Sequence, residues 1–418
     1  MDTDRLIIFG EKMNCKPKLR FPEFSDEWNS ERVDKLFSHV RNGFVGTATP
    51  YYVEKGVPYL QSNNIRRNKI DKRKLVYINE EFHKKNKKSV LKKGDILMVQ
   101  SGHAGECAVV PEEFNNANCH ALVVMTPTKQ VNPDFCAYYM NSSIGKKRIH
   151  KLITGQTINH ILASDLKKYR INIPTLTEQS KIASFLSKVD SKIDLLEKKQ
   201  ELWETYKKGI VQQIFSQKLR FKDENGEDYP DWKDKKFSEI LIEHKTKSTG
   251  NEEVFSVSVH KGLINQVEHL GRTFAAPDTS KYNLVKPGDI VYTKSPTGDF
   301  PLGIIKQSKL DKNVIVSPLY GVFSPLNKDL GLILDSYFES PINTKNYLHP
   351  IVQKGAKNTM NITNNTFLSR SLILPIHDKE QSKIANFLST IDIIIEITFQ
   401  ELEGVEHFKK GLLQQMFC

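Results

Sequence analysis

Apolar residues recur in alternating steps of four and three along two stretches of the chain, from residue 182 to 214 and from residue 384 to 416. In a helix, this 3.5-residue period gathers the apolar side chains into the seam of a coiled coil. Two such seams in one chain can satisfy each other, so the pattern predicts two long helices paired antiparallel. The seam positions expected to pack first are Ile182, Leu186, Val189, Ile193, Ile384, Leu388, Ile391 and Ile395.

Polar residues and glycines interrupt both helical patterns. The polar interruptions are Gln200, Lys207, Thr398 and Lys409. Gly209 and Gly411 lie inside the patterns at matching positions. Because glycine inside a helix costs about 1 kcal/mol relative to alanine, we expect each glycine to allow a close approach of the two helices or a local bend.

The stretches before each helix mix short β-type runs with turn residues. The run Gly94–Ser101 (GDILMVQS) has a counterpart in Gly288–Ser295 (GDIVYTKS), where Gly-Asp predicts a turn and the residues after it predict a strand. Polar loops follow both strands, and a second pair of polar loops precedes the helices. Loops at strand ends often carry recognition residues. The loop positions that we predict to contact a ligand are Gln100, Ser101, His103, Thr157, Asn159, Thr293, Lys294, Lys354 and Lys357.

The second half of the chain repeats sequence motifs of the first half. Lys18–Phe21 (KLRF) returns as Lys218–Phe221, 200 positions later. At 418 residues the chain exceeds what one core usually serves, so the repeat predicts an α+β protein with two α/β domains in tandem, each followed by a long helix, with pseudo-two-fold symmetry. The predicted segments are domain 1 (16–173), a central helix (174–217), domain 2 (218–375) and a C-terminal helix (376–418). As a helix, the 39 residues from Thr177 to Phe215 would span roughly 58 Å and could act as a ruler between the domains.

The net charge of +12 is carried by the domains rather than the helices. Between residues 66 and 93 there are twelve basic and three acidic residues. Such density is typical of a polyanion-binding surface, although a solvated lysine-rich surface would look the same. Arg66, Arg67 and Lys69 begin this stretch and are predicted DNA contacts.

The composition also argues against several classes of protein, namely membrane, secreted, zinc-binding and disulfide-rich proteins. No apolar run approaches the length of a membrane span, and the acidic start of the chain is unlike a secretory signal, so we expect no membrane contact and a cytoplasmic location. The cysteines are sparse, odd in number and without a Cys-x-x-Cys pair. We therefore expect neither structural zinc nor a disulfide framework. The five cysteines are Cys15, Cys107, Cys119, Cys136 and Cys418.

The sequence contains no convincing catalytic motif. Ser317–Tyr320 (SPLY) lacks the second proline of an amino-methyltransferase motif, and there is no phosphate-cradling glycine loop. Asp231 with Glu243, His244 and Lys245 has the composition of a nuclease core, but its first half lies in a repeated segment whose other copy, around Phe24 to Trp28, has no matching triad. The histidines show no metal-ligand spacing. We therefore predict no catalytic and no metal-binding residue.

Together these motifs resemble the DNA-specificity (S) subunit of Type I restriction-modification systems. The resemblance rests on the repeated Leu-Arg-Phe with a following Trp28 or Trp232, on the Gly-Asp-Ile strands, and on the Glu-Gln-x-x-Ile-Ala-x-Phe-Leu helices. It implies two target recognition domains that each read half of a gapped site in double-stranded DNA. It also implies helices that set the spacer and dock two methyltransferase (M) subunits, with restriction (R) subunits completing the complex.

The same resemblance implies that the chain itself holds no cofactor. S-adenosylmethionine for adenine-N6 methylation, and ATP and Mg²⁺ for translocation and cleavage, would bind to the partner subunits. Two other interpretations stay open: a stand-alone DNA-modifying or DNA-cleaving enzyme with duplicated recognition domains, and a coiled-coil adaptor that binds no nucleic acid.

Overall fold

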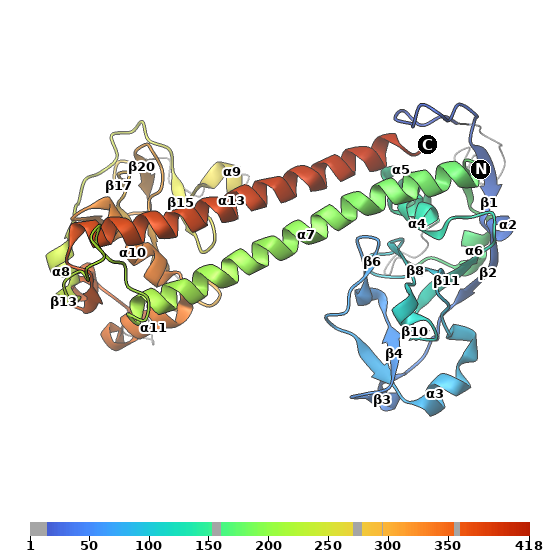
Figure 1. The fold of residues 1–418 in the computed structure, drawn as a ribbon, viewed down its shortest axis with the longest axis horizontal. Helices are drawn as coiled ribbons and strands as arrows, with labels where there is room; N and C mark the ends of the chain where they lie inside the picture. Colours follow the sequence, from blue (N-terminus) through green and yellow to red (C-terminus); the bar gives the residue numbers. More distant parts are fainter. Residues whose placement is uncertain (1–14, 153–159, 271–277, 295, 355–359) are drawn as a thin grey trace. The chain divides into compact units, whose positions relative to one another are not determined.

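The chain folds into two compact units. The computed structural model describes residues 15–152, 160–270, 278–294, 296–354 and 360–418 (Figure 1). Unit 1 contains Met1–Leu196 together with Glu401–Cys418, and unit 2 contains Glu197–Gln400. Each unit has its own hydrophobic core. The boundaries of the compact units therefore differ from those of the four predicted segments, because each unit includes part of both long helices.

Both units are built on the same frame. A four-stranded antiparallel sheet in unit 1 has the order β2 (Phe37–Asn42), β11 (Leu122–Pro127), β8 (Ile96–Val99), β9 (Cys107–Val109). The sheet of unit 2 has the matching order β14 (Leu241–Glu243), β21 (Gly321–Pro325), β18 (Ile290–Tyr292), β19 (Ile305–Gln307). The sequence repeat is thus a repeat of the fold, as predicted.

A strand pair and one helical turn lead into each sheet. In unit 1 these are β1 (Asn29–Arg32), paired with β12 (Arg170–Ile173), and α2 (Val33–Leu36). In unit 2 they are β13 (Lys233–Lys236), paired with β24 (Ser371–Leu374), and α8 (Phe237–Ile240). The pairing brings the start of each domain beside the segment that leads into its long helix.

The strands β8 (ILMV) and β18 (IVY) are buried along their whole length because both of their faces are covered. Side chains alternate across a strand, so Ile96 and Met98 of β8 join one core cluster of unit 1, while Leu97 and Val99 join another. In unit 2, Ile290 and Val291 of β18 divide in the same way.

The Gly-Asp turns have a structural explanation. The Asp95 carboxylate accepts hydrogen bonds from the backbone amide of Lys92 (3.0 Å), from Thr126 Oγ1 (2.7 Å) and from Arg41 (3.3 Å). Asp289 is held in the same way by a backbone amide, a hydroxyl and His244 Nε2 (2.8 Å). Both aspartates are buried, so each turn ties the sheet to its neighbours.

The additional strands attached to the frame differ between the units, whereas the helices α4, α5 and α6 of unit 1 follow the frame in the same order as α10, α11 and α12 of unit 2. Among its described residues, unit 1 has a second sheet, β10-β4-β7-β3, a hairpin and the helices α3, α4, α5 and α6. Their bounds are β3 (Tyr52–Val53), β4 (Val57–Leu60), β5 (Ile65–Arg66), β6 (Lys69–Ile70), β7 (Val76–Ile78), β10 (Asn118–Cys119), α3 (Glu80–Lys85), α4 (Pro133–Asn141), α5 (Ser143–His150) and α6 (Ala163–Lys168).

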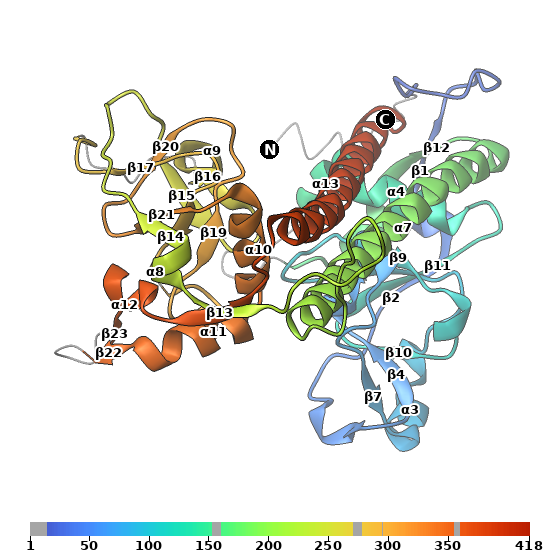
Figure 2. The same ribbon diagram turned by 60° about the vertical axis from the view of Figure 1, so that its left-hand side comes forward.

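Unit 2 has only two-stranded additions beside its frame sheet, within the part of the chain that the structure describes (Figure 2). They are β15 (Phe255–Ser258) with β16 (Gly262–Asn265), β17 (Asn283–Val285) with β20 (Val314–Val316), and β22 (Gln353–Lys354) with β23 (Met360–Asn361). The helices are α9 (Gln266–Leu270), α10 (Lys328–Phe338), α11 (Pro341–Leu348) and α12 (Asn364–Leu368).

The two long helices are α7 (Leu176–Phe215) and α13 (Asp378–Gln415). In unit 1 the first part of α7 packs with Leu412 and Met416 of α13, and in unit 2 the last part of α7 packs with the first part of α13. This is the predicted antiparallel pairing, seen within each unit. The predicted seam residues are buried, except that Ile395 is partly buried. The length of the ruler between the domains stays a prediction.

The structure corrects two sequence expectations. A Cβ atom placed on Gly209 or Gly411 would meet no other atom within 4 Å, so these glycines do not serve a close approach of the two helices, and the alternative, a local bend, stays a prediction. Cys15 and Cys418 form a disulfide, with Cα atoms 6.0 Å apart. Sequence spacing could not reveal it because 403 positions separate the two residues.

Candidate nucleic-acid interface

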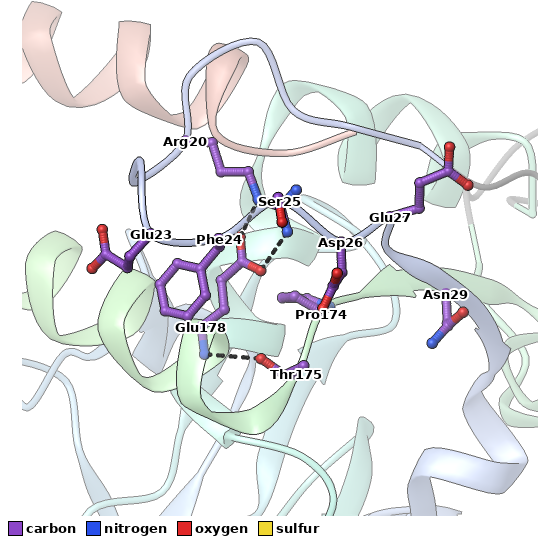
Figure 3. A pocket seen from close by; sticks show the side chains of 10 residues that line it. All are labelled: Arg20, Glu23, Phe24, Ser25, Asp26, Glu27, Asn29, Pro174, Thr175 and Glu178. Atoms are coloured by element: carbon purple, nitrogen blue, oxygen red, sulfur yellow. Dashed lines mark hydrogen bonds and ion pairs between the residues drawn. The ribbon is translucent and has the colours of Figure 1, made fainter.

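The first segment of each domain binds the start of the long helix that follows the domain. In unit 1, Arg20 donates two hydrogen bonds to Glu178, at 2.7 and 2.8 Å (Figure 3). Trp28 Nε1 donates a third to the same carboxylate at 3.3 Å. In unit 2, Arg220 and Trp232 bind Glu380 in the same way, at 3.0 Å each for the closest contact. Both glutamates are buried. The motif was visible in the sequence, but its role as a clamp was not.

The clamp of unit 1 borders a pocket that does not suit DNA. The pocket holds about 190 Å³, and Figure 3 shows Glu23, Asp26 and Glu27 among its lining residues. The hydrogen bonds to Glu178 raise the pKa of Arg20. Because acidic side chains repel phosphates, this pocket does not suit a nucleic-acid backbone.

In unit 2 the domain meets the long helices through a closed ring of alternating charges. Neighbouring nitrogen and oxygen atoms lie 2.5 to 3.8 Å apart around this charge ring. In order, its members are Lys207, Glu339, Lys306, Asp335, Lys309 and Asp392. Lys207 comes from α7, Asp392 from α13, and the other four from the domain, so the charge ring fixes the domain to both helices.

The pKa shifts in the charge ring follow from burial opposed by charge. Burial alone would lower the pKa of Lys207, but Glu339 and Asp392 outweigh it and raise the pKa. Burial alone would raise the pKa of Asp335, but Lys306 and Lys309 outweigh it and lower the pKa. Both groups therefore stay charged, as a buried ion pair requires.

Unit 1 uses a smaller junction at the matching place. Lys409 of α13 pairs with Asp190 of α7, and Tyr138 Oη of α4 donates to Asp190 at 2.7 Å. Burial, with a smaller contribution from Asp190, raises the pKa of Tyr138. Lys207 and Lys409 were noted only as polar interruptions of the seams, and the structure shows that each has an acidic partner on the other helix.

Two predicted DNA contacts are engaged with the long helices instead. The β5–β6 hairpin turns at Arg67 and Asn68, which both have positive φ, as a two-residue type I′ turn requires. Arg67 pairs with Glu406 of α13 at 3.0 Å, and Lys69 pairs with Asp194 of α7. Arg66 is exposed. The hairpin therefore docks onto the helices, and this use was not visible in the sequence.

The loops after the Gly-Asp strands divide into buried and accessible positions. The Gln100 side chain is only 1% exposed and donates a hydrogen bond to Asn42. Thr293 is 3% exposed, and its hydroxyl accepts a hydrogen bond from the backbone amide of Ile304. Their burial contradicts direct contact with DNA. Ser101 and Lys294 are partly exposed, and His103 is exposed. Lys294 has φ +59°, and burial lowers its pKa.

The second predicted loop pair is only partly within the described residues. Thr157, Asn159 and Lys357 lie outside them, and Lys354 is described by its backbone in β22 alone. These four positions stay predictions.

A larger set of exposed basic residues lies in unit 1, on α3 and on the segments before and after it in the chain. All of its members are exposed, and three of them pair with a nearby acid: Lys72 with Glu113, Arg73 with Asp71, and Lys93 with Glu112. This surface, here called the α3 surface, comprises Lys72, Arg73, Lys74, Lys84, Lys85, Lys87, Lys88, Lys92 and Lys93.

The residues once considered as a nuclease core have structural partners. Glu243 accepts a hydrogen bond from Asn364 at 2.9 Å, and His244 is bound to Asp289. Among the described residues, no three His, Cys, Asp or Glu side chains gather in a way that could hold a metal ion. Within the same residues, no helix has the length and apolar character needed to cross a membrane.

Comparison with known proteins gives one consistent result. Residues 25–205 match the family model of the Type I restriction modification DNA specificity domain. The chain is 26% identical over 432 residues to the putative type I restriction enzyme MjaX specificity subunit of Methanocaldococcus jannaschii, covering 98% of this chain and 96% of that one. It is 24% identical over 396 residues to the EcoKI specificity subunit of Escherichia coli K12, covering 88% and 83%.

A solved structure supports the fold over nearly the same extent. The chain is similar to the crystal structure of a Type-I restriction-modification system S subunit from M. genitalium, with a TM-score of 0.60 and 16% identity. The likeness covers 97% of this chain and 99% of that one. The tandem arrangement of domain and helix is therefore a known fold.

Proposed function

We propose that this chain, which is a specificity subunit of a type I restriction-modification system, reads one half of a bipartite gapped DNA site with each recognition domain. The supporting observation is that the two units share the four-stranded frame and the helices that follow it in the chain, whereas the other strands attached to the frame differ. A shared frame suits a common complex, and different attachments suit two different half-sites. Sequence is read by base contacts in the grooves, while phosphate contacts position the protein.

The α3 surface supplies phosphate contacts in unit 1. Its basic residues are exposed, and binding of lysine and arginine to phosphates releases counterions, which drives association. Ser101, His103 and Lys294 are the accessible loop positions next to the frame sheets. The undescribed positions Thr157, Asn159 and Lys357 remain candidate base contacts.

The long helices dock two M subunits. In unit 2, Leu202 and Tyr206 of α7 and Ile393 and Ile397 of α13 are exposed, and the members of each pair lie four positions apart on one helix face. Gly209 and Gly411 destabilise their helices and face open space. Glycine at these two positions is explained if the backbone of a partner protein approaches them closely. Ile397 and Gly411 repeat Leu195 and Gly209 after 202 positions, which suits two copies of one partner.

Catalysis belongs to those partners. The M subunits bind S-adenosylmethionine and methylate adenine N6, and R subunits use ATP and Mg²⁺ for translocation and cleavage. The assembled complex acts in the cytoplasm, where its DNA is found.

The test is to map methylated adenines in a host that expresses the chain with its M subunit. We expect one methylated adenine in each half of an interrupted sequence, and a continuous site would contradict the two-domain assignment. Purified chain with S-adenosylmethionine or Mg²⁺ alone should show no turnover. Its DNA affinity should fall steeply with salt concentration, whereas a coiled-coil adaptor would show no binding at all.

A further inference from the structure

The two ends of unit 1 meet at one place. The Leu19 amide donates to the Gln415 carbonyl at 2.9 Å, and the Trp28 amide donates to the Cys15 carbonyl at 3.1 Å. Asn172 Nδ2 donates both to Cys15 Sγ (3.0 Å) and to the Cys418 carbonyl (2.9 Å). The Cys15–Cys418 disulfide therefore joins two segments that also share backbone and side-chain contacts.

Unit 2 has the same junction without a disulfide. The Leu219 amide donates to the Gln213 carbonyl at 3.1 Å, as Leu19 donates to Gln415 in unit 1. Phe215 packs on Trp232 with ring centroids 6.0 Å apart, as Phe417 packs on Trp28 at 6.3 Å. Here the polypeptide itself runs from α7 to Leu219 through residues 216–218. The disulfide of unit 1 thus takes the place of a peptide connection in unit 2.

We propose that Cys15 and Cys418 are a reversible thiol–disulfide site that closes this junction when oxidised and releases it when reduced. A low-molecular-weight disulfide is the oxidant: the two thiols lose two protons and two electrons to it, their sulfurs bond, and the oxidant is cleaved into two thiols. The cytoplasm normally keeps thiols reduced, so the bond reports a shift of the redox state toward oxidation. This inference does not depend on the DNA-recognition function.

The chemistry is confined to this pair. Cys15 and Cys418 are partly exposed, while Cys107, Cys119 and Cys136 are buried. Burial raises the pKa of Cys119 to about 12 and raises the pKa of the other two buried thiols as well. Because the thiolate is the reactive form, the three buried cysteines stay unreactive in the folded protein. The Asn172 donor at the Cys15 sulfur stabilises its thiolate.

The first measurement identifies the reacting cysteines. The full-length protein is incubated with oxidised or reduced glutathione, alkylated in the folded state and digested for mass spectrometry. We expect alkylation of Cys15 and Cys418 only after reduction, and a cross-linked peptide of the two only after oxidation. Free thiols at both positions after oxidation, or a covalent dimer of two chains, would overturn the proposal.

The second measurement shows whether the bond closes the junction. In hydrogen exchange, the peptide containing Leu19 should exchange about tenfold faster in the reduced protein, and the variants Cys15→Ser and Cys418→Ser should match the reduced protein under both conditions. The peptide containing Leu219 is the internal control and should not respond to redox state. Equal exchange at Leu19 in the oxidised and reduced proteins would show that the bond closes nothing.

Discussion

In each unit the domain binds the long helices at the same aspartate–lysine pair, but the domain side chains that bind this pair differ between the units. Asp190 and Lys409 of unit 1 correspond to Asp392 and Lys207 of unit 2, and in both units the aspartate and lysine pair across the helices. The partner from the domain is a tyrosine hydroxyl in unit 1 and a set of four charged side chains in unit 2. The helices therefore present a constant connection to which dissimilar domains attach, each with its own side chains.

The largest expected effect compares Lys409→Met with Lys207→Met. Loss of Lys409 leaves the buried Asp190 with only a neutral hydroxyl, which should cost about 3–5 kcal/mol. Loss of Lys207 leaves Asp392 paired with Lys309, so the cost should be about 1.5–3 kcal/mol. Urea unfolding followed by ¹⁹F NMR of 5-fluorotryptophan separates the units, since Trp28 lies in unit 1 and Trp203 and Trp232 lie in unit 2. A larger loss for Lys207→Met would contradict the comparison.

Acid should weaken unit 2 through Asp335. Its pKa is lowered in the folded protein, so its contribution to stability is present above the unfolded-state pKa of about 3.9. That contribution is lost as the pH falls through the lower, folded-state value. The midpoint of urea unfolding at Trp232, measured between neutral pH and pH 3, should fall less steeply in Asp335→Asn. An unchanged slope in this variant would mean that other carboxylates control the acid response.

DNA binding should separate the α3 surface from the hairpin. The double variant Lys84→Ser/Lys85→Ser should reduce the slope of log affinity against log salt by about 2, because two phosphate contacts are lost. The matched control, Arg67→Ser/Lys69→Ser, removes the same charge from residues that pair with the helices. The salt slope of this control should change less than that of Lys84→Ser/Lys85→Ser. Equal changes in the two slopes would mean that the hairpin also contacts DNA phosphates.

The smallest effect concerns the junction of unit 1. Tyr138→Phe removes only the hydroxyl that donates to Asp190 and should cost about 1 kcal/mol, seen at Trp28 and not at Trp232. A matched change of a hydroxyl outside the junction, Ser38→Ala, should have no measurable effect. If Tyr138→Phe also shifted the Trp232 signal, the two units would not unfold separately.

The features predicted from the sequence were those with local patterns. The 3.5-residue period of Ile182 to Ile214 placed the helices and their buried faces, and the repeated Gly-Asp turns marked the central strands, because both signals depend on near neighbours in the chain. Lys207 and Lys409 were also visible as interruptions. A charged residue in an apolar seam signals an ionic partner, and here that partner was on the other helix.

The features that were missed depend on contacts between distant segments. Gln100 has the residue type of a base-reading side chain, but Asn42, from another strand, takes up its amide. The charge ring combines residues from α7, the domain and α13 with no regular spacing. The Cys15–Cys418 bond has no local signal either. Sequence periodicity identifies the helices and strands, whereas only the packed structure shows which polar side chains already have partners within the protein.

The division of the chain also bears on its synthesis. Unit 2 is continuous, so all of its residues have emerged from the ribosome once residue 400 has been made and cleared the exit tunnel. Unit 1 needs Glu401–Cys418 to cover Trp28 and to pair with the first part of α7. The domain that is translated first is therefore the one that must wait, with part of its apolar surface uncovered, while the second can already fold.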